Sequence, residues 1–419
     1  MKSEKTIYTI TPPEKLEAHI ELPSSKSMSN RALMISALAG GHVLPQNLSD
    51  CDDTEVMIRA LRDMPQTIDI MAAGTAMRFM TAFLSCHEGS HIITGTERMK
   101  HRPIGVLVDA LRQLGAKIEY KGREGYPPLR ITGGTLEGGE IEMPGNVSSQ
   151  YISALLMTAP MMKNGLTLRL TGDIISRPYI DLTLWMMGEF VADAQWEDGR
   201  TIVVRPTPYT EREYYIENDW SAASYWYEMV ALGGQGSTAT LTGLADGSKQ
   251  GDSIVRYIFS LLGVKTIFNR DKDGRPGTIT LRHTGRCVPR FEYNLINCPD
   301  LAQTIITTCA ALNIPFHFTG LQTLKIKETD RIEALKAELR KLGYIIHDIN
   351  GCEMIWTGER CAAKSDTVIE TYEDHRMALA FAPLCMKTGS IRIANPTVVT
   401  KSYPKYWNDL ESCGFSLER

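Results

Sequence analysis

One local pattern recurs along the chain: an amphipathic helix, a glycine, and then a short run of alternating apolar residues. Its clearest copy is Leu107–Gly115 followed by Ala116–Tyr120. Glycine is typical of a helix C-terminus, because it adopts the left-handed backbone that ends a helix before a strand begins. Further copies cover Leu182–Gly188, Ile254–Gly263, Ile332–Gly343 and Tyr406–Gly414, and a degenerate copy ends at Met64-Pro65.

Six copies, spaced roughly 50 to 80 residues apart, indicate one supersecondary unit repeated along the chain. A chain of 419 residues has the length of two or three domains, so we expect two domains with three units each. Glycine pairs at 133–134 and 138–139 predict hairpin turns, and the whole pattern predicts a mixed α/β fold. No Gly-x-Gly-x-x-Gly joins a strand to a helix, which disfavours a doubly wound nucleotide-binding fold.

Composition and charge exclude several classes of protein. Hydrophobic residues make up 43% and charged residues 22%, as in soluble globular proteins. The longest apolar stretches fall short of the roughly 18 residues that span a bilayer, and residues 1–15 carry no signal-peptide pattern, so we expect a cytoplasmic protein. The net charge of −4 argues against a general nucleic-acid binder. Nine cysteines without a Cys-x-x-Cys pair predict reduced thiols.

Candidate anion-binding residues gather where helices are predicted to begin. The segment Pro23–Arg31 contains four serines, and Ser27 and Arg31 share one face of the helix predicted over 27–38. Gly74-Thr75 precedes another helix, and a glycine there lets backbone N–H groups approach a phosphate closely.

The same arrangement returns downstream. Asn146–Gln150 places polar side chains before the helix predicted over Tyr151–Met157, and Ser176-Arg177 repeats the theme. Earlier in the chain, after Gly74-Thr75, the segment Arg98–Pro103 carries four basic residues. Its proline predicts that the run opens a helix. Ordinary helix capping remains the alternative explanation for each serine motif.

Two later motifs carry both signs of charge. Asp330 with Glu333 three residues later predicts a capping box, which leaves Lys327, Glu328 and Arg331 at the mouth of the helix.

Another helix is predicted after Glu373–Arg376, and the basic pair Lys401 and Lys405 follows the strand-like segment Thr397–Thr400. Cations at helix N-termini oppose the helix dipole, at a cost of about 0.3–1 kcal/mol each. At least five predicted helix beginnings carry Lys, Arg, Ser or Gln, and sequences rarely repeat such a cost without a bound counter-charge. We therefore interpret the pattern as a cleft lined by helix N-termini that holds multiply charged substrates.

At these motifs the sequence closely resembles the 5-enolpyruvylshikimate-3-phosphate synthase family, also called the 3-phosphoshikimate 1-carboxyvinyltransferase family. The matching segments run in family order: Pro23–Arg31, Ala73–Arg78, Arg98–Pro103, Ser148–Gln150, Asp219–Tyr225, Pro299–Asp300, Lys327–Arg331, Asp374–Met377 and Lys401–Pro404. The resemblance implies the enolpyruvyl-transferase fold, an inside-out α/β barrel with six βαβαββ-type repeats, three per domain. It implies an N-terminal lobe over 24–217 on the phosphoshikimate side. A C-terminal lobe over 1–23 and 218–419 would hold the acid and base residues, and the lobes would close over the substrates.

The activity implied by the resemblance is transfer of the enolpyruvyl group of phosphoenolpyruvate to the 5-hydroxyl of shikimate 3-phosphate, with release of phosphate. It implies no metal and no organic cofactor, and a monomer whose partners are these two small molecules rather than nucleic acid or membrane. One alternative is the sister enzyme that acts on a UDP-sugar, whose first motif begins Lys-Asn where this chain has Lys26-Ser27. The other is a non-catalytic anion-binding homologue, against which the retention of Asp300, Lys327 and Glu328 weighs.

Family roles carry over residue by residue. Asp300 is the expected partner of the attacking hydroxyl, Glu328 the acid that protonates the methylene carbon, and Lys26 and Lys327 are the further catalytic residues. Shikimate 3-phosphate is expected to contact Lys26, Ser27, Arg31, Ser148, Ser149, Gln150, Ser176, Asp300 and Lys327. Phosphoenolpyruvate is expected to contact Lys26, Gly74, Arg102, Gln150, Arg331, Arg376 and Lys401.

The chain departs from the family pattern close to Gly74. Ala72 replaces an asparagine, which removes one hydrogen-bond donor near phosphoenolpyruvate, and Phe79 replaces a proline, which is expected to tilt the helix. The preceding segment, Asp63–Met71, is shorter than the family pattern, in keeping with the degenerate first repeat.

Overall fold

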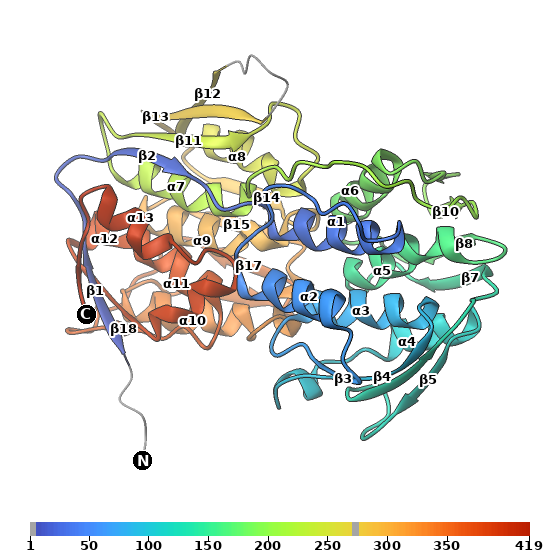
Figure 1. The fold of residues 1–419 in the computed structure, drawn as a ribbon. Coiled ribbons are helices and arrows are strands. Elements are labelled where there is room, and N and C mark those ends of the chain that lie inside the picture. Colours follow the sequence, from blue (N-terminus) through green and yellow to red (C-terminus); the bar gives the residue numbers. More distant parts are fainter. Residues whose placement is uncertain (1–5, 270–275) are drawn as a thin grey trace. The chain divides into compact units, whose positions relative to one another are not determined.

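The chain passes twice between two structural units, after Pro23 and after Ile216. We call Ser24–Ile216 the continuous unit, and the chain up to Pro23 together with Glu217–Arg419 the split unit. The structure is a computed structural model and describes residues 6–269 and 276–419. Figure 1 labels the elements of both units.

The continuous unit contains two four-stranded sheets, β3-β4-β6-β5 and β7-β8-β10-β9. In each sheet the first two strands are parallel and a hairpin adds the other two antiparallel. The elements follow one another as βαβαββ. They are α1 (Lys26–Leu38), α2 (Asp52–Asp63), β3 (Thr67–Asp69), α3 (Gly74–Cys86), β4 (Gly89–Thr94), the 3-10 helix η1 (Met99–His101), α4 (Gly105–Gln113), β5 (Lys117–Tyr120), β6 (Leu129–Gly133), β7 (Gly139–Pro144), α5 (Ser149–Thr158), η2 (Ala159–Met161), β8 (Leu166–Thr171), α6 (Arg177–Glu189), β9 (Ala194–Trp196) and β10 (Thr201–Val204).

The split unit contains three four-stranded sheets, β12-β13-β11-β2, β14-β15-β17-β16 and β18-β19-β1-β20. Its N-terminal strands are β1 (Ile7–Thr11) and β2 (Glu17–Glu21), and β2 pairs in parallel with β11. The rest are α7 (Trp220–Leu232), β11 (Thr238–Leu244), η3 (Gly251–Ile254), α8 (Val255–Leu261), β12 (Leu262–Asn269), β13 (Gly277–Cys287), β14 (Phe291–Asn294), η4 (Pro299–Leu301), α9 (Ala302–Ala311), β15 (Phe316–Thr319), η5 (Gln322–Ile326), α10 (Arg331–Lys341), β16 (His347–Ile349), β17 (Glu353–Trp356), β18 (Val368–Ile369), α11 (His375–Phe381), η6 (Ala382–Leu384), α12 (Cys385–Thr388), β19 (Ile391–Ala394), η7 (Pro396–Lys401), α13 (Tyr406–Ser412) and β20 (Ser416–Glu418).

Five of the six repeats have a four-stranded sheet. The remaining one, called the sixth repeat below, is the degenerate copy that contains α1 and α2, and it lacks a sheet in the part of the chain that the structure describes. Among the described residues its strands are reduced to one isolated parallel bridge, between Gln46 and Tyr215, and α2 leads almost directly into β3 of the next repeat. A hairpin such as β5-β6, which follows the second helix in the complete repeats, is missing at this place. The shortness of the segment Asp63–Met71 therefore corresponds to this missing hairpin. The sheets and helices of both units confirm the predicted α/β fold class.

Left-handed backbone ends the second helix of each repeat. Gly115, Gly343 and Gly414 have φ values of +103°, +93° and +88°, as the repeated pattern predicts. Met64, where the degenerate copy has no glycine, takes φ +38°. The prediction for Gly188 is wrong, because α6 continues past it and the left-handed residue is Val191 at φ +70°.

Two further local predictions are wrong. The segment Thr397–Thr400 lies in the 3-10 helix η7 rather than in a strand, since Pro396 at its start favours a helical turn. The glycine pairs 133–134 and 138–139 do not turn a hairpin, because the strands they separate, β6 and β7, belong to different sheets.

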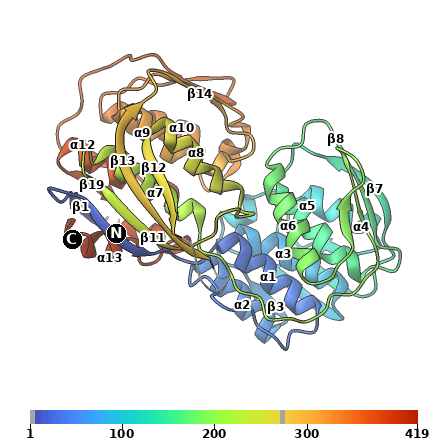
Figure 2. The same cartoon turned by 90° about the horizontal axis from the view of Figure 1, so that it is seen from above.

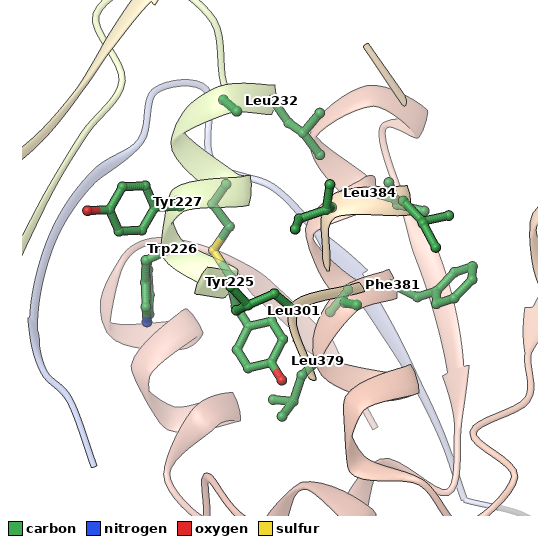
Figure 3. Close-up of a cluster of buried hydrophobic side chains, with 14 of the residues drawn as sticks. Tyr225, Trp226, Tyr227, Leu232, Leu301, Leu379, Phe381 and Leu384 are labelled. Atoms are coloured by element: carbon green, nitrogen blue, oxygen red, sulfur yellow. The ribbon is translucent and has the colours of Figure 1, made fainter. Parts of the chain in front are cut away.

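Each unit has three helices at its centre, α1, α3 and α5 in one and α7, α9 and α11 in the other. Nearly every residue of α3, α5, α7, α9 and α11 is buried, which suits helices whose apolar residues run all the way round. The sheets lie outside these helices (Figure 2). In the split unit, Tyr225, Leu301 and Leu379 meet between the three central helices (Figure 3). Burying each such side chain contributes about 1.5–3 kcal/mol.

The described residues contain no helix that is both long and apolar enough to cross a membrane. All nine cysteines are free, and four of them are buried in the cores: Cys51, Cys298, Cys309 and Cys385.

A carboxyl group lies in the core of the split unit. Glu228 of α7 is fully buried, and its Oε1 accepts a hydrogen bond from Thr307 Oγ1 of α9 at 2.7 Å. Burial raises the pKa of Glu228 well above 4.5, against the opposing effect of the threonine hydrogen bonds. The native protein therefore holds a proton that the unfolded chain releases.

We predict that Glu228 makes stability fall as pH rises above about 4.5, by up to about 1.4 kcal/mol per pH unit. The reason is that the unfolded state loses the proton first while the native state retains it. In Glu228→Gln this contribution disappears, so the stability of the variant relative to wild type should increase from pH 5 to 8. Denaturant unfolding at several pH values measures this difference, with exposed Glu88→Gln as control. Parallel curves for wild type and Glu228→Gln would contradict the assignment.

Candidate active site

The N-terminal ends of the central helices of the continuous unit meet. Thr75 Oγ1 at the start of α3 accepts a hydrogen bond from Gln150 Nε2 at the start of α5, at 3.0 Å. One turn further on, the Arg78 guanidinium lies 5.6 Å from the ring centroid of Tyr151. Neither these helices nor α1 and α6 have an acidic residue in the first turn, so their positive ends are not neutralised locally.

Arg31 is a buried cation held only by neutral groups. It is 2% exposed, and its guanidinium donates to Ser27 Oγ (2.7 Å), Thr183 Oγ1 (2.8 Å) and Ser153 Oγ (3.1 Å). Among the described residues no carboxylate lies within ion-pair distance of it. Burial lowers the pKa of Arg31 to about 10, so it stays charged at neutral pH. A buried, charged and unneutralised guanidinium makes this place favourable for an anion.

Phe79, the residue that stands where the family pattern has proline, packs against this guanidinium. Its ring centroid lies 5.6 Å from Arg31 Cζ, within the range of a cation–π contact. The helix α3 runs without interruption from Gly74 to Cys86 through this residue.

A second pair of arginines approaches the start of α3. A Cβ atom added to Gly74 would lie 2.6 Å from Arg78 Nη1 and 2.7 Å from Arg102 Nη1. Arg78 is 5% exposed, donates to Gly74 O at 2.7 Å, and its buried Nε has no hydrogen-bond partner among the described residues. Only a residue without a side chain leaves both guanidinium groups in place at this helix N-terminus.

The predicted serines lie at the starts of α5 and α6. Ser148 is the N-cap of α5 and accepts from Gln150 N at 3.4 Å, and Ser149 follows it. Ser176 is the residue before α6, in left-handed conformation at φ +55°, and its side chain makes no capping bond. Left-handed backbone at a residue other than glycine costs about 1–3 kcal/mol and is concentrated at functional sites. Capping therefore explains Ser148 and leaves the Ser176 hydroxyl for another role.

Lys26, the first residue of α1, forms an ion pair. Its Nζ lies 3.4 Å from Asp53 Oδ2, and the Asp53 side chain is almost fully buried. Asp53 belongs to α2, so the packing of α2 against α1 fixes the position of this lysine.

The split unit gathers charge around Arg331, the first residue of α10. Its side chain is 2% exposed and contacts three carboxylates: Nε to Asp374 Oδ2 at 2.7 Å, Nη2 to Glu328 Oε2 at 2.9 Å, and Nη1 to Asp300 Oδ1 at 3.1 Å. These acids raise the pKa of Arg331, although its burial alone lowers it.

Three more cations complete this network. Asp300 also contacts Arg376 Nη2 (Oδ2, 3.2 Å) and Lys327 Nζ (Oδ1, 3.2 Å), and Glu328 Oε1 contacts Lys401 Nζ at 3.1 Å. Burial by itself raises the pKa of Asp300, but Arg376, Lys327 and Arg331 together hold it well below its usual value. Asp300 is thus ionised and surrounded by cations.

The sequence and the fold both match known proteins over nearly the whole chain. The model of the family described as EPSP synthase (3-phosphoshikimate 1-carboxyvinyltransferase) matches residues 10–71 and 65–410. The 3-phosphoshikimate 1-carboxyvinyltransferase of Bacteroides fragilis is 56% identical over 411 residues, which cover 98% of each chain, and that of a Sulfurovum species is 35% identical over 96% of this chain and 98% of its own.

This chain belongs to the EPSP synthase family. The structure of EPSP synthase from Acinetobacter baumannii has the same fold, with a TM-score of 0.79 at 21% identity over 99% of this chain and all of the other. The two segments of the family match overlap at 65–71, where the sixth repeat lacks its hairpin. The sequence interpretation of the family and fold is therefore confirmed.

The structure distributes the predicted site residues between two clusters. In the continuous unit, the starts of α1, α3, α5 and α6 and the residue after η1 carry Lys26, Ser27, Arg31, Gly74, Arg102, Ser148, Ser149, Gln150 and Ser176. In the split unit, one network of ion pairs joins Asp300, Lys327, Glu328, Arg331, Arg376 and Lys401.

Other charged residues of the same motifs lie outside the clusters. Lys100 Nζ pairs with Glu97 and His101 Nδ1 contacts Glu97 O, whereas Arg102 of that basic run lies against Gly74. Asp330 caps α10 as predicted, but Glu333 contacts Lys336 and does not complete a capping box.

Sequence reasoning gave no role to Arg78, Asp374 or Asp53, which take part in the clusters. Arg78 lies in the motif Ala73–Arg78 and Asp374 in the motif Asp374–Met377. The charge of each residue within a matching motif could therefore have suggested a role in the site. Asp53 lies 27 residues from Lys26, and only the packing of two helices brings them together. Among the described residues, no three His, Cys, Asp or Glu side chains are grouped to hold a metal ion.

We predict that Asp374→Asn destabilises the protein by about 1.5–3 kcal/mol, because it removes the closest of the three carboxylates that contact buried Arg331. Asp374 is fully buried and also caps α11 by accepting from Arg376 N at 2.9 Å. The matched control is Asp330→Asn at the partly exposed N-cap of α10, where asparagine caps equally well and the change should stay within about 0.5 kcal/mol. Urea unfolding compares the two, and equal losses would mean that Asp374 acts only as a cap.

Proposed function

We propose that this chain is a 3-phosphoshikimate 1-carboxyvinyltransferase. It transfers the enolpyruvyl group of phosphoenolpyruvate to the 5-hydroxyl of shikimate 3-phosphate and releases phosphate. The observation that carries the proposal is that each unit by itself gathers a cluster of charged groups. The cluster of the continuous unit holds helix N-termini with the buried arginines Arg31 and Arg78, and the cluster of the split unit holds three carboxylates among four cations. The Bacteroides fragilis relative bears this name at 56% identity.

The continuous unit supplies most of the binding energy for phosphorylated groups. Ser27 and Arg31 receive the carboxylate of shikimate 3-phosphate, and Ser148, Ser149 and Ser176 receive its phosphate. The phosphate of phosphoenolpyruvate binds at the start of α3, where Gly74, Arg102 and Gln150 meet, with Lys26 and Lys401 as further cations. Arginine suits these contacts because its planar fork matches carboxylate and phosphate oxygens.

The split unit supplies the acid and base. Arg331 and Arg376 bind the carboxylate of phosphoenolpyruvate, which draws both guanidinium groups away from Asp300. The pKa of Asp300 then rises, since the cations that lower it have found another anion. Substrate binding in this way converts a stably ionised carboxylate into a base for the 5-hydroxyl.

The reaction is an addition followed by an elimination. The 5-hydroxyl oxygen bonds to C2 of phosphoenolpyruvate and gives its proton to Asp300, while Glu328 protonates C3. In the tetrahedral intermediate, C3 then returns a proton to the Glu328 carboxylate as the bond from C2 to the phosphate oxygen breaks and the phosphate leaves with that electron pair. The products are an enol ether and inorganic phosphate. Orientation of two small reactants by fixed cations is worth up to about 7–11 kcal/mol.

Phosphate release with phosphoenolpyruvate and shikimate 3-phosphate tests the proposal directly. Release that requires both compounds supports it. Release only with a UDP-sugar acceptor would identify the sister activity, and binding of the substrates without release would identify a non-catalytic homologue.

We predict that Asp300→Ala and Glu328→Gln lower kcat by about 10²–10⁴-fold, the usual contribution of general acid–base catalysis. Binding of shikimate 3-phosphate should change by less than a few-fold, because its anionic groups are held by the continuous unit. Calorimetry and single-turnover kinetics separate binding from chemistry. Exposed Glu333→Gln in α10 is the control. Near-normal kcat in both site variants would remove these roles.

We predict that Gly74→Ala raises the KM for phosphoenolpyruvate roughly tenfold with little change in stability, because the new methyl group displaces only the mobile ends of Arg78 and Arg102. Steady-state kinetics and thermal unfolding measure the two effects. The matched control is Gly188→Ala in α6, where an added Cβ meets no atom within 4 Å. An unchanged KM in Gly74→Ala would place phosphoenolpyruvate elsewhere.

A further inference from the structure

A hollow of about 750 Å³ lies in the split unit, away from the ion-pair network of Arg331. Its lining comes from α8, from β12 and from the end of β13. The strand β12 is the edge of its sheet, so the hollow forms where α8 packs against that edge. A volume of this size accommodates a small organic molecule.

The lining of the hollow carries basic residues and, among the described residues, no acidic ones. Arg256, Lys265 and Arg286 belong to it, and Arg256 pairs with Asp246, which lies outside the lining. Lys265 and Arg286 line the hollow and are exposed, and among the described residues neither has an ion-pair partner. The hollow therefore offers positive charge that the protein does not neutralise.

One wall of the hollow is aromatic and held in place. The ring of Tyr257 is 58% exposed, while Phe268 is partly buried. The Arg256 guanidinium lies 4.7 Å from the first ring centroid and 5.1 Å from the second.

Arg256 is itself fixed by polar contacts. It pairs with Asp246 at 2.7 Å and donates to the Tyr257 hydroxyl at 2.9 Å. Its Nε is buried without a hydrogen-bond partner among the described residues. The aromatic wall is thus pre-organised, because its rings are held by the stacked guanidinium rather than free to collapse into the hollow.

We infer that this hollow is a second binding site, for a small aromatic anion. A planar ring would stack on Tyr257, and its carboxylate, sulfonate or phosphate group would pair with Lys265 and Arg286. Exposed aromatic area next to unpaired cations favours this chemistry over an inorganic ion, which would gain nothing from the rings.

The test uses the full-length protein saturated with shikimate 3-phosphate, and 8-anilinonaphthalene-1-sulfonate as fluorescent probe. We expect saturable binding that weakens with added salt, since part of the attraction is electrostatic. Arg286→Ser and Tyr257→Ser should each weaken binding at least tenfold. The matched control is Arg282→Ser, an exposed arginine on the same face of β13 that does not line the hollow, and it should change binding by less than twofold.

Three results would overturn the inference: no saturable binding, equal losses in Arg282→Ser and Arg286→Ser, or an unchanged affinity in Tyr257→Ser. Inorganic phosphate competing as well as benzoate would show a site for simple anions. Phosphate release by the Arg286 and Tyr257 variants should match wild type, so this test and that of the proposed function fail independently.

Discussion

Two buried arginines, Arg31 and Arg331, show the constraint on which both clusters depend: a charge removed from water needs compensation. Arg331 has three carboxylates around it, so the protein itself compensates its charge before any ligand binds. Arg31 has only hydroxyl and carbonyl oxygens. The first arrangement stabilises the fold, with two of its acids also available for chemistry, whereas the second leaves positive charge for a ligand to neutralise.

The repeat places these charges. Because each βαβαββ repeat sends its first helix into the centre of its unit, the N-termini of three such helices meet at one end. Three backbone dipoles then favour negative charge at the same place. A repeat can lose its hairpin, as the sixth has, without losing this effect, since α1 still contributes its N-terminus. This explains how a degenerate copy can persist in a working fold.

The departures near Gly74 fit the same physics. Proline at position 79 would have fixed the backbone but offered Arg31 no aromatic face, whereas phenylalanine provides one at 5.6 Å. The ring gives a desolvated guanidinium some electrostatic compensation without neutralising it. The site therefore keeps its preference for an anion while the cost of burying Arg31 falls.

Whether a structural feature could be predicted from the sequence depended on how far apart the interacting residues lie along the chain. Helix starts at Lys26, Gly74, Ser149 and Arg331 follow from neighbouring residues, since caps, glycine and apolar spacing act within one or two turns. The same local reasoning failed at Gly188 and at Thr397–Thr400, where packing chose a different end and a different element.

The amino-acid sequence by itself determined the family, the α/β repeats and which residues stand at helix N-termini, because these are matters of local order along the chain. Only the tertiary structure decided which cations are paired. Arg331 meets Asp374 across 43 residues, and Arg31 meets Thr183 across 152. No spacing rule reaches that far, and whether a charge is compensated depends on what folding brings beside it.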